Sequence, residues 1–449
     1  MTTSKTQNTR ITHRTPNTLN TLNIRNSLTG VRSSAVVLLL AVAAGAGLPG
    51  LAAADDSDPQ SGSEASGECT FPMKKQIQGR PWALQRLVFD QLWQDTKGKG
   101  VRVAVIDTGV DDTNPQLTSA VDRAAGTDLL PPPKDGSQDP AAKGKGKGKP
   151  SGGDGTVDPI GHGTKVAGII AARPRAGTGF VGLAPEATII PIRQNDDKST
   201  GTATTMAAAI RHAIAKKAQV INISQDTAKP LRADSDLELA VREALNRDIV
   251  VVASAGNDGL AGNVKVTYPA AYKGVLAVAA SDRNDERAPF SQTGDFVGVA
   301  APGVDMVSTV PKGGQCVDNG TSFSAPYVAG VAALLRAKHP GWKQYQVVAQ
   351  IEQTAERAVN GRDEFVGWGV VDPVRALNDD EHPLNAPTPD RAVSNGPAGP
   401  EPIALQMGET RKERISRISI YVLATTGLLV AVIAGVAIVL RDRRSRVIR

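Results

Sequence analysis

The chain has 449 residues, of which 40% are hydrophobic, 4% aromatic and 21% charged, with 45 Gly, 29 Pro and two Cys. This composition excludes a disordered chain, a collagen-like chain and a small disulfide-stapled protein, and the length allows more than one domain. The formal net charge of +6 has three possible sources. These are a nucleic-acid-binding surface, a membrane-facing segment, or charge carried outside the folded domain.

The N-terminal residues 1–54 are typical of a secretory signal peptide. They contain no Asp or Glu, and five Lys and Arg residues precede the apolar run 35–44 and the small residues Ala52–Ala54. We therefore expect export and cleavage near Ala54. A buried core helix is the alternative, and the Gly and Pro residues at positions 45–50 disfavour it.

Three segments are predicted to follow the signal peptide. Residues 55–80 are polar and rich in Gly and Ser, and we expect them to form an N-terminal extension. Residues 81–377 are expected to form the globular body. Residues 378–417 begin with a Pro-rich stretch that carries six prolines between 378 and 410, which predicts an extended tether.

The C-terminal part of the chain is typical of a membrane anchor. Residues 418–440 contain no charge, and 23 residues at about 1.5 Å each suffice to cross a ~30 Å hydrocarbon layer as a helix. Residues 441–449 carry five Arg and one Asp, which predicts a cytoplasmic tail by the positive-inside bias. The basic stretch 411–417 weakens this bias, but an export signal places the body outside. We expect a single-pass protein of the cell membrane with an extracytoplasmic body.

The net charge of +6 belongs to the ends of the chain. Residues 1–54 carry five positive charges, residues 411–417 a net +3 and residues 441–449 a net +4, which leaves −6 for residues 55–410. Because phosphate binding needs a concentrated positive face, we expect no nucleic-acid partner.

Short apolar runs alternate with helical patterns in the body. The predicted strands are 101–106, 188–192, 220–223, 249–253 and 275–279. The predicted helices are 164–172, 202–217, 236–246, 324–338 and 345–357. The alternation predicts an α/β fold in which helices cover both faces of a mostly parallel sheet. Ligand chemistry in such folds gathers at the carboxyl ends of the strands.

A Gly- and Lys-rich stretch, 131–155, interrupts this alternation. It contains almost no apolar residue and predicts a mobile surface loop. A phosphate-binding loop is the alternative, but the GxxxxGK(S/T) pattern is not met and no strand leads into it.

Three short motifs each supply one member of an acid, base and nucleophile set. They are VIDTG at Val105–Gly109, GHGT at Gly161–Thr164 and GTSFSAP at Gly320–Pro326. Taken singly, each has a common structural alternative: a turn-forming Asp, a structural His or a helix N-cap Ser. Their occurrence together, in an order in which catalytic triads recur, outweighs those alternatives.

The predicted catalytic residues are Asp107, His162 and Ser322. The Ser322 hydroxyl needs a base to take its proton during attack, and a neutral His162 imidazole is suited to that task. Asp107 is expected to fix the imidazole tautomer and to stabilise the imidazolium. Asn257, in the stretch 252–259, is expected to donate its amide to the oxyanion together with the Ser322 backbone N–H. A simple turn is the alternative for Asn257.

These motifs resemble those of the subtilisin-like serine proteases, the subtilases. The resemblance covers most of the body and extends to Pro81–Ala83, Asn114–Leu117 and the GWGVVDP stretch Gly367–Pro373. Within that group the chain is most similar to the mycosins, membrane-anchored proteases associated with type VII secretion, which also have a signal, a core, a Pro-rich tether and one C-terminal helix.

The resemblance implies a three-layer subtilisin-like fold with a mostly parallel central sheet. It also implies a serine endopeptidase that acts through an acyl-enzyme on exported proteins or peptides, at a type VII secretion membrane complex. A structural subunit of that complex, with catalysis secondary, is the alternative function. A non-catalytic binding module is disfavoured because the triad and Asn257 are all present.

The expected substrate-binding residues are Ser224, Gln225, Ala255 and Gly256. Many subtilisins have Ser-Leu-Gly-Gly where this chain has Ser-Gln-Asp-Thr at 224–227. Asp226 in this segment is predicted to favour a basic residue at the P1 position of the substrate. Residues 55–80 are short for a folded inhibitory propeptide, so we expect no activation by propeptide removal.

Cys69 and Cys316 are the two cysteines of the chain, and export predicts that they form a disulfide. Two free thiols are the alternative. The sequence has five His and no HExxH motif or paired cysteine spacing, so neither a metal site nor a cofactor is expected. Asp-Thr-Gly also occurs in aspartic proteases, but Asp107 has no second such motif to form a dyad.

Overall fold

The computed structural model describes residues 69–73, 76–130, 153–196, 201–226, 234–262, 265–390 and 409–446. The predicted signal peptide, most of the N-terminal extension and most of the 131–155 loop lie outside these residues. The bounds predicted for the signal peptide, extension, body, tether and tail therefore stay predictions.

A sheet of seven parallel strands forms the centre of the body, in the order β2-β3-β1-β4-β5-β6-β7. The strands are β1 (Arg102–Asp107), β2 (Thr127–Asp128), β3 (Thr188–Arg193), β4 (Val220–Ile223), β5 (Val250–Ser254), β6 (Leu276–Ser281) and β7 (Val297–Pro302). A separate antiparallel pair consists of β8 (Met306–Thr309) and β9 (Gln315–Asp318). The predicted α/β fold with a mostly parallel sheet is confirmed, and each predicted strand is found within two residues of its expected bounds.

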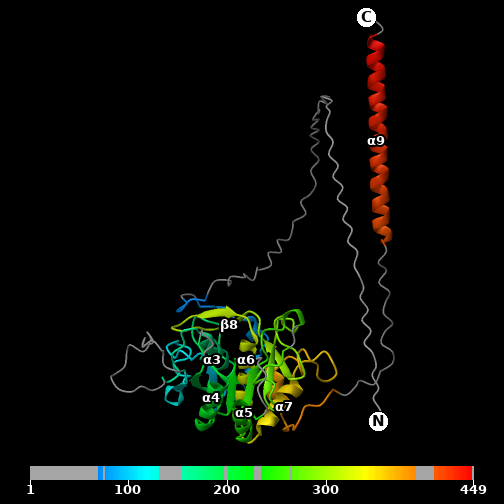
Figure 1. Ribbon diagram of the computed structural model, residues 1–449. Coiled ribbons are helices and arrows are strands. Elements are labelled where there is room, and N and C mark those ends of the chain that lie inside the picture. The colour runs from blue at the N-terminus through cyan, green and yellow to red at the C-terminus, as the bar shows by residue number, and fades with distance from the viewer. Residues whose placement is uncertain are drawn as a thin grey trace, which may run out of the picture. The chain divides into compact units, whose positions relative to one another are not determined.

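Helices cover both faces of this sheet (Figure 1). The long helices of the body are α3 (His162–Ala171), α4 (Ala203–Ala215), α5 (Asp236–Asn246), α6 (Thr321–Lys338) and α7 (Gln344–Thr354). The short ones are α1 (Trp82–Gln85), α2 (Phe89–Leu92), α8 (Pro373–Asn378) and the 3-10 turns η1 (Arg123–Ala125) and η3 (Leu260–Gly262).

The alternating side chains of the strands explain these two layers. In β1, Val103 and Val105 belong to the apolar cluster that includes α3 and α6, whereas Ala104 and Ile106 belong to the cluster that includes α4 and α5. All four side chains are fully buried. Burial of the sheet on both faces explains why its strands are continuous apolar runs in the sequence.

Three of the predicted site segments follow neighbouring strands of the sheet. Strand β1 pairs with β4 and β4 with β5, and the register aligns Ile106, Ile223 and Ala253 at the carboxyl ends. Asp107, the 224–226 segment and the segment that leads to Asn257 therefore start from one edge of the sheet. Helix α6 packs against the same three strands.

Helix α9 (Arg411–Arg446) contains the predicted membrane span 418–440. Within the part of the chain that the structure describes, α9 is the one helix long and apolar enough to cross a membrane. Its apolar side chains are exposed rather than packed in a protein core. The candidate membrane span is confirmed, and its orientation stays a prediction.

Candidate active site

Asp107 and His162 contact each other through a short hydrogen bond. Asp107 is the last residue of β1 and is fully buried. Its Oδ1 atom lies 2.7 Å from His162 Nδ1 and accepts a second bond from the backbone N–H of Thr108, also at 2.7 Å. This pairing leaves the Nε2 side of the imidazole available for a reacting group.

A buried carboxylate that the sequence analysis did not single out builds the start of the His162 helix. Asp158 accepts hydrogen bonds from the backbone N–H groups of Gly161 and Thr164, each at 2.8 Å, and from the Thr108 hydroxyl at 2.8 Å. It thereby satisfies N–H groups at the start of α3 and joins them to the residue after Asp107. An acidic residue shortly before a helix is the signal that marks such a cap.

The pKa of His162 is raised from its ordinary value. Burial lowers it, but the charge and hydrogen bond of Asp107 and the charge of Asp158 together outweigh burial, while Lys165 acts in the lowering direction. The pKa of Asp158 is also raised, by burial first and with a smaller contribution from the charge of Asp107. The site therefore stabilises a protonated imidazole, the species that forms when His162 accepts a proton.

Ser322 lies in the first turn of α6, directly before Phe323. Its hydroxyl donates a hydrogen bond to the backbone carbonyl of Ser224 at 3.0 Å. Among the hydrogen bonds of the described residues, none joins Ser322 to His162. The next side chain, Phe323, lies with its ring centroid 5.4 Å from that of His162. Since catalytic hydrogen bonds are often unformed without substrate, the lack of this bond does not exclude Ser322 as the nucleophile.

Asn257 is held beside the same helix start. Its Oδ1 atom accepts hydrogen bonds from the backbone N–H and the hydroxyl of Thr321, both at 2.9 Å. The Thr321 hydroxyl lies 3.2 Å from the backbone nitrogen of Gly256 as well. Because the amide oxygen is occupied, the Nδ2 group is the part of Asn257 left to donate to a ligand. Thr321 is a second site residue that the sequence analysis did not single out.

Most of the body matches a known protein family. The model of the subtilase family matches residues 98–369, which include Asp107, His162, Asn257 and Ser322. The chain belongs to the subtilase family. The predicted subtilisin-like resemblance is confirmed.

Curated proteases and solved structures agree with this assignment. The chain is 37% identical to the thermophilic serine proteinase of Bacillus sp. strain AK1 over 68% of this chain and 69% of that protein. It is 35% identical to thermitase of Thermoactinomyces vulgaris over 68% of this chain and 99% of that protein. The solved structure of the MycP3 protease from the type VII (ESX-3) secretion system matches with a TM-score of 0.57 and 34% identity, over 68% of this chain and 91% of that chain.

The MycP1 structure from Mycobacterium smegmatis matches with a TM-score of 0.58 and 28% identity, over 75% of this chain and 90% of that chain. The predicted similarity to the mycosins is thus confirmed. The roles of single residues in this subtilase stay predictions.

The expected substrate-binding residues lie on the two segments that flank Ser322 and Asn257. Ser224 is buried, and its hydroxyl oxygen accepts a hydrogen bond from Asn222 at 2.8 Å. Gln225 accepts a side-chain hydrogen bond from Gln194. The carbonyl of Ala255 accepts a bond from the Thr267 hydroxyl at 2.7 Å. These bonds fix both segments next to the candidate nucleophile.

Gly256 leaves room for the Asp226 carboxylate. The φ of Gly256 is +105°, and a Cβ there would lie 2.8 Å from Asp226 Oδ2. Desolvation raises the pKa of Asp226, and the nearby charge of Asp258 raises it further. The Asp226 carboxylate thus lies against Gly256, on the segment that leads to Asn257.

Residues 69–73, from the predicted N-terminal extension, contact loops next to the candidate active site. Cys69 and Cys316 lie at disulfide distance, with their Cα atoms 6.0 Å apart. The Phe71 ring packs on Gly161, where a Cβ would overlap it, and the Met73 backbone N–H donates to the Gly313 carbonyl at 3.0 Å. Residues 69–73 therefore lie against the loop that precedes His162.

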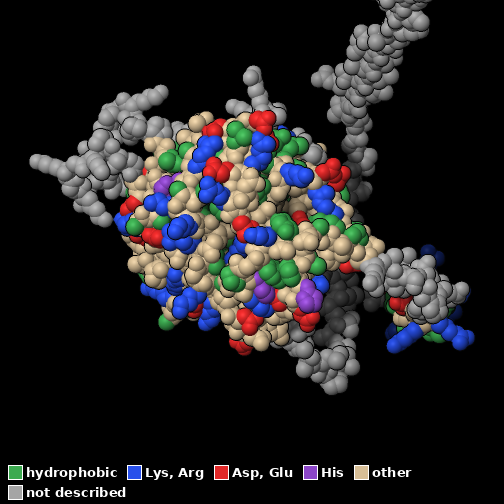
Figure 2. Space-filling view, turned by 90° about the horizontal axis from the view of Figure 1, so that it is seen from below, with side chains coloured by type: hydrophobic (Ala, Val, Ile, Leu, Met, Phe, Trp, Pro, Cys, Tyr) green, Lys and Arg blue, Asp and Glu red, His purple; other side chains and the backbone are tan. Residues whose placement is uncertain are grey.

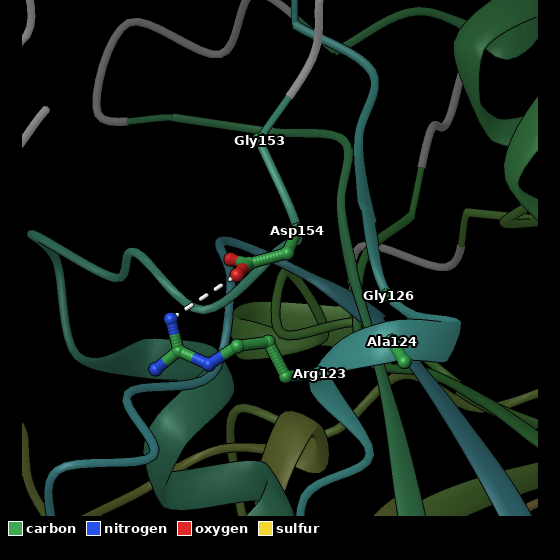
Figure 3. A pocket seen from close by; sticks show the side chains of 5 residues that line it. All are labelled: Arg123, Ala124, Gly126, Gly153 and Asp154. Atoms are coloured by element: carbon green, nitrogen blue, oxygen red, sulfur yellow. Dashed lines mark hydrogen bonds and ion pairs between the residues drawn. The ribbon is translucent and has the colours of Figure 1, made fainter. Parts of the chain in front are cut away.

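An open hollow of about 540 Å³ is lined by Arg123, Ala124, Gly126, Gly153 and Asp154 (Figure 3). None of the candidate site residues lines it. Arg123 points toward Asp154, at 3.1 Å, and also pairs with Asp112. Among the described residues, no group of three or more His, Cys, Asp or Glu side chains could hold a metal ion.

Proposed function

We propose that this protein is a membrane-anchored serine endopeptidase that hydrolyses peptide bonds of exported proteins. The observation that carries the proposal is the 2.7 Å hydrogen bond between buried Asp107 and His162, next to the Ser322 turn on a subtilase scaffold. An orienting carboxylate, a base and a hydroxyl in this arrangement are the parts that acyl transfer needs.

The proposed reaction proceeds through an acyl-enzyme. His162 Nε2 takes the proton of the Ser322 hydroxyl as the oxygen attacks the scissile carbonyl, and Asp107 stabilises the imidazolium. Asn257 Nδ2 and the Ser322 backbone N–H donate to the oxyanion of the tetrahedral intermediate. His162 then returns the proton to the leaving amine, and a water molecule activated by the same base hydrolyses the ester on Ser322.

We further propose that the protein works at the outer side of the cell membrane with a type VII secretion complex. Two observations support this: the candidate membrane span in α9 and the similarity to the MycP proteases of type VII secretion systems. The tail after α9 is then cytoplasmic. A nucleic-acid partner is not proposed, since residues 55–410 carry a net charge of −6. On the face shown in Figure 2, acidic and basic side chains are interspersed.

Labelling with a fluorophosphonate probe tests the proposed nucleophile. The wild-type chain is expected to react covalently, and Ser322→Ala is expected to give no labelled peptide because the attacking oxygen is missing. Mass spectrometry of the labelled peptide locates the site. Labelling of the Ser322→Ala variant at another residue would contradict the assignment.

The Asp226 carboxylate is expected to make Lys or Arg the preferred P1 residue. Replacement by Gly should lower kcat/KM for a Lys substrate about tenfold relative to the matched Leu substrate, since it removes the opposite charge. The preference requires the ionised carboxylate. Because the pKa of Asp226 is raised, the preference should weaken, as pH falls, at a higher pH than it would for a carboxyl with the ordinary pKa of Asp. A peptide library read at two pH values measures both effects. Equal cleavage after Lys and Leu by the wild type would contradict this role.

A second function, as a structural component of the secretion complex, is favoured by one comparison. MycP1, of which one solved structure is 30% identical to this chain, is described as a serine protease and an essential component of the type VII (ESX-1) secretion system. Secretion assays that compare Ser322→Ala with deletion of the chain distinguish the two functions. Rescue of secretion by the inactive variant would favour the structural function.

A further inference from the structure

A buried lysine lies one helical turn from His162. Lys165 is on α3, three residues after His162, and its side chain is only 8% exposed. Its ammonium group lies 2.7 Å from Oδ2 of Asp318, the last residue of β9. Asp318 precedes Ser322 by four residues. One ion pair therefore joins the helix that carries His162 to the end of β9, four residues before Ser322.

The Phe323 ring lies near both Lys165 and His162. The Lys165 ammonium is 5.9 Å from the centre of the Phe323 ring, and that ring is 5.4 Å from the His162 ring. A cation facing an aromatic ring at such a distance is attracted to it. The ion pair thus also holds the side chain that borders the imidazole.

Hydrogen bonds also join α3 to the other strand of the same antiparallel pair. The Ser308 hydroxyl donates to the Lys165 carbonyl at 2.5 Å, and the Thr309 hydroxyl donates to the Thr164 carbonyl at 2.9 Å. Ser308 and Thr309 belong to β8, which pairs with the strand that carries Asp318. Helix α3 therefore has a fixed position on the β8–β9 pair, and the Lys165–Asp318 contact completes it.

We propose that the Lys165–Asp318 ion pair is a positioning device for the proposed peptidase reaction, setting His162 against Ser322 through Phe323. The inference rests on the proposed function. Such an ion pair is expected to add little to the free energy of unfolding, because the cost of desolvating a buried lysine nearly cancels its attraction to a carboxylate. A pair that fixes the base relative to the nucleophile has a function in catalysis, where misplacement by about 1 Å costs up to about a hundredfold in rate.

The pKa of His162 is a second quantity that the proposal predicts will change, because several charges surround the imidazole. Asp107 faces the imidazole from β1, Asp158 from the segment before α3 and Lys165 from α3 itself, while Asp318 on β9 faces Lys165. The Lys165 charge lowers the pKa of His162. Removal of that charge should therefore raise the pKa of His162, and removal of the Asp318 charge should lower it.

Peptide hydrolysis by the full chain, measured across pH, tests the proposal. Lys165→Met is expected to lower kcat about tenfold with little change in KM, and to move the acid limb of kcat/KM to higher pH. Lys165→Arg should restore most of kcat, and Asp318→Asn should move the acid limb to lower pH. NMR titration of His162 should show the same pKa shifts without any turnover.

Lys338→Met is a matched control, because Lys338 also forms ion pairs, with Asp95 and Asp380, but sits at the far end of α6. It should leave both kcat and the acid limb unchanged. If Lys165→Met and Asp318→Asn lose only thermal stability, with wild-type kcat and His162 titration, the ion pair is merely structural and the proposal is wrong. Absence of Ser322-dependent hydrolysis in the wild type would instead refute the proposed function.

Discussion

Replacement of Asp107 with Asn is expected to lower kcat about 10⁴-fold while the body stays folded. Asp107 Oδ1 accepts from both Thr108 N–H and His162 Nδ1. The amide oxygen of Asn can keep the Thr108 bond, so the side chain has no reason to leave its buried place. The negative charge that stabilises the imidazolium is lost, and the amide group can also favour the wrong imidazole tautomer.

The Asp107→Asn substitution should also change the pH dependence of the activity. Only neutral His162 can act as a base, so activity is lost as pH falls through its pKa. Because Asp107 raises that pKa, the acid limb of the Asp107→Asn variant should lie at lower pH than that of the wild type. Steady-state kinetics over a pH series measure both quantities.

Asp285→Asn provides a comparison for Asp107→Asn. Asp285 also binds a cationic partner, Arg86 at 2.6 Å, but contacts no candidate site residue. It should retain near-wild-type kcat. A folded Asp107→Asn protein whose kcat stays within tenfold of the wild type would show that Asp107 does not orient the base.

Replacement of Asn257 with Ala is expected to lower kcat roughly 10²–10³-fold, a loss of about 2.7–4 kcal/mol of transition-state stabilisation, with little change in KM. The Nδ2 group is the donor that the structure leaves available, since Thr321 occupies Oδ1. A donor that bonds the oxyanion more strongly than the ground-state carbonyl affects kcat rather than KM.

Two further variants separate donation from packing at this position. Asn257→Asp keeps an acceptor for Thr321 but places a negative charge where the oxyanion forms, so its kcat should fall at least as far as that of Asn257→Ala. Thr321→Val removes the hydroxyl that fixes the amide and should cost about tenfold in kcat. Single-turnover acylation rates provide the measurement. A fully active Asn257→Asp enzyme would exclude the oxyanion role.

The strands and long helices of the body could be predicted from the sequence because both faces of the sheet are buried. Runs such as Val220–Ile223 are apolar without interruption, and Asp236–Asn246 matches its predicted helix at both ends. The places of the proposed triad residues in the fold could be predicted because short motifs put them at a strand end and at helix starts. Neighbouring parallel strands bring those ends together regardless of the distance along the chain.

Other features depend on contacts that no local pattern reveals. Strands β8 and β9 bury polar side chains. The buried Ser308 hydroxyl, for example, donates its hydrogen bond to the Lys165 carbonyl of α3. Helix α6 begins at Thr321, three residues before the predicted start, because Asn257 accepts the Thr321 N–H. Pro326 consequently lies inside the helix.

The partners at the site are equally distant in sequence. Lys165 and Asp318 are separated by 153 residues, and Asn257 and Thr321 by 64. Neither residue of such a pair lies in a local sequence pattern from which its partner could be predicted. The proposed catalytic residues could therefore be predicted as single positions, and the side chains that contact them could not.

The cysteine pair changes what a single cut of the backbone can do to this protein. Cys69 and Cys316 have a sequence separation of 247, and the segment between them contains both Asp107 and His162. After cleavage of one peptide bond anywhere within that span, the N-terminal fragment remains covalently attached to the part that continues into α9. A nicked molecule would keep the acid and base on the same anchored assembly as Ser322 until a reductant separated the two pieces.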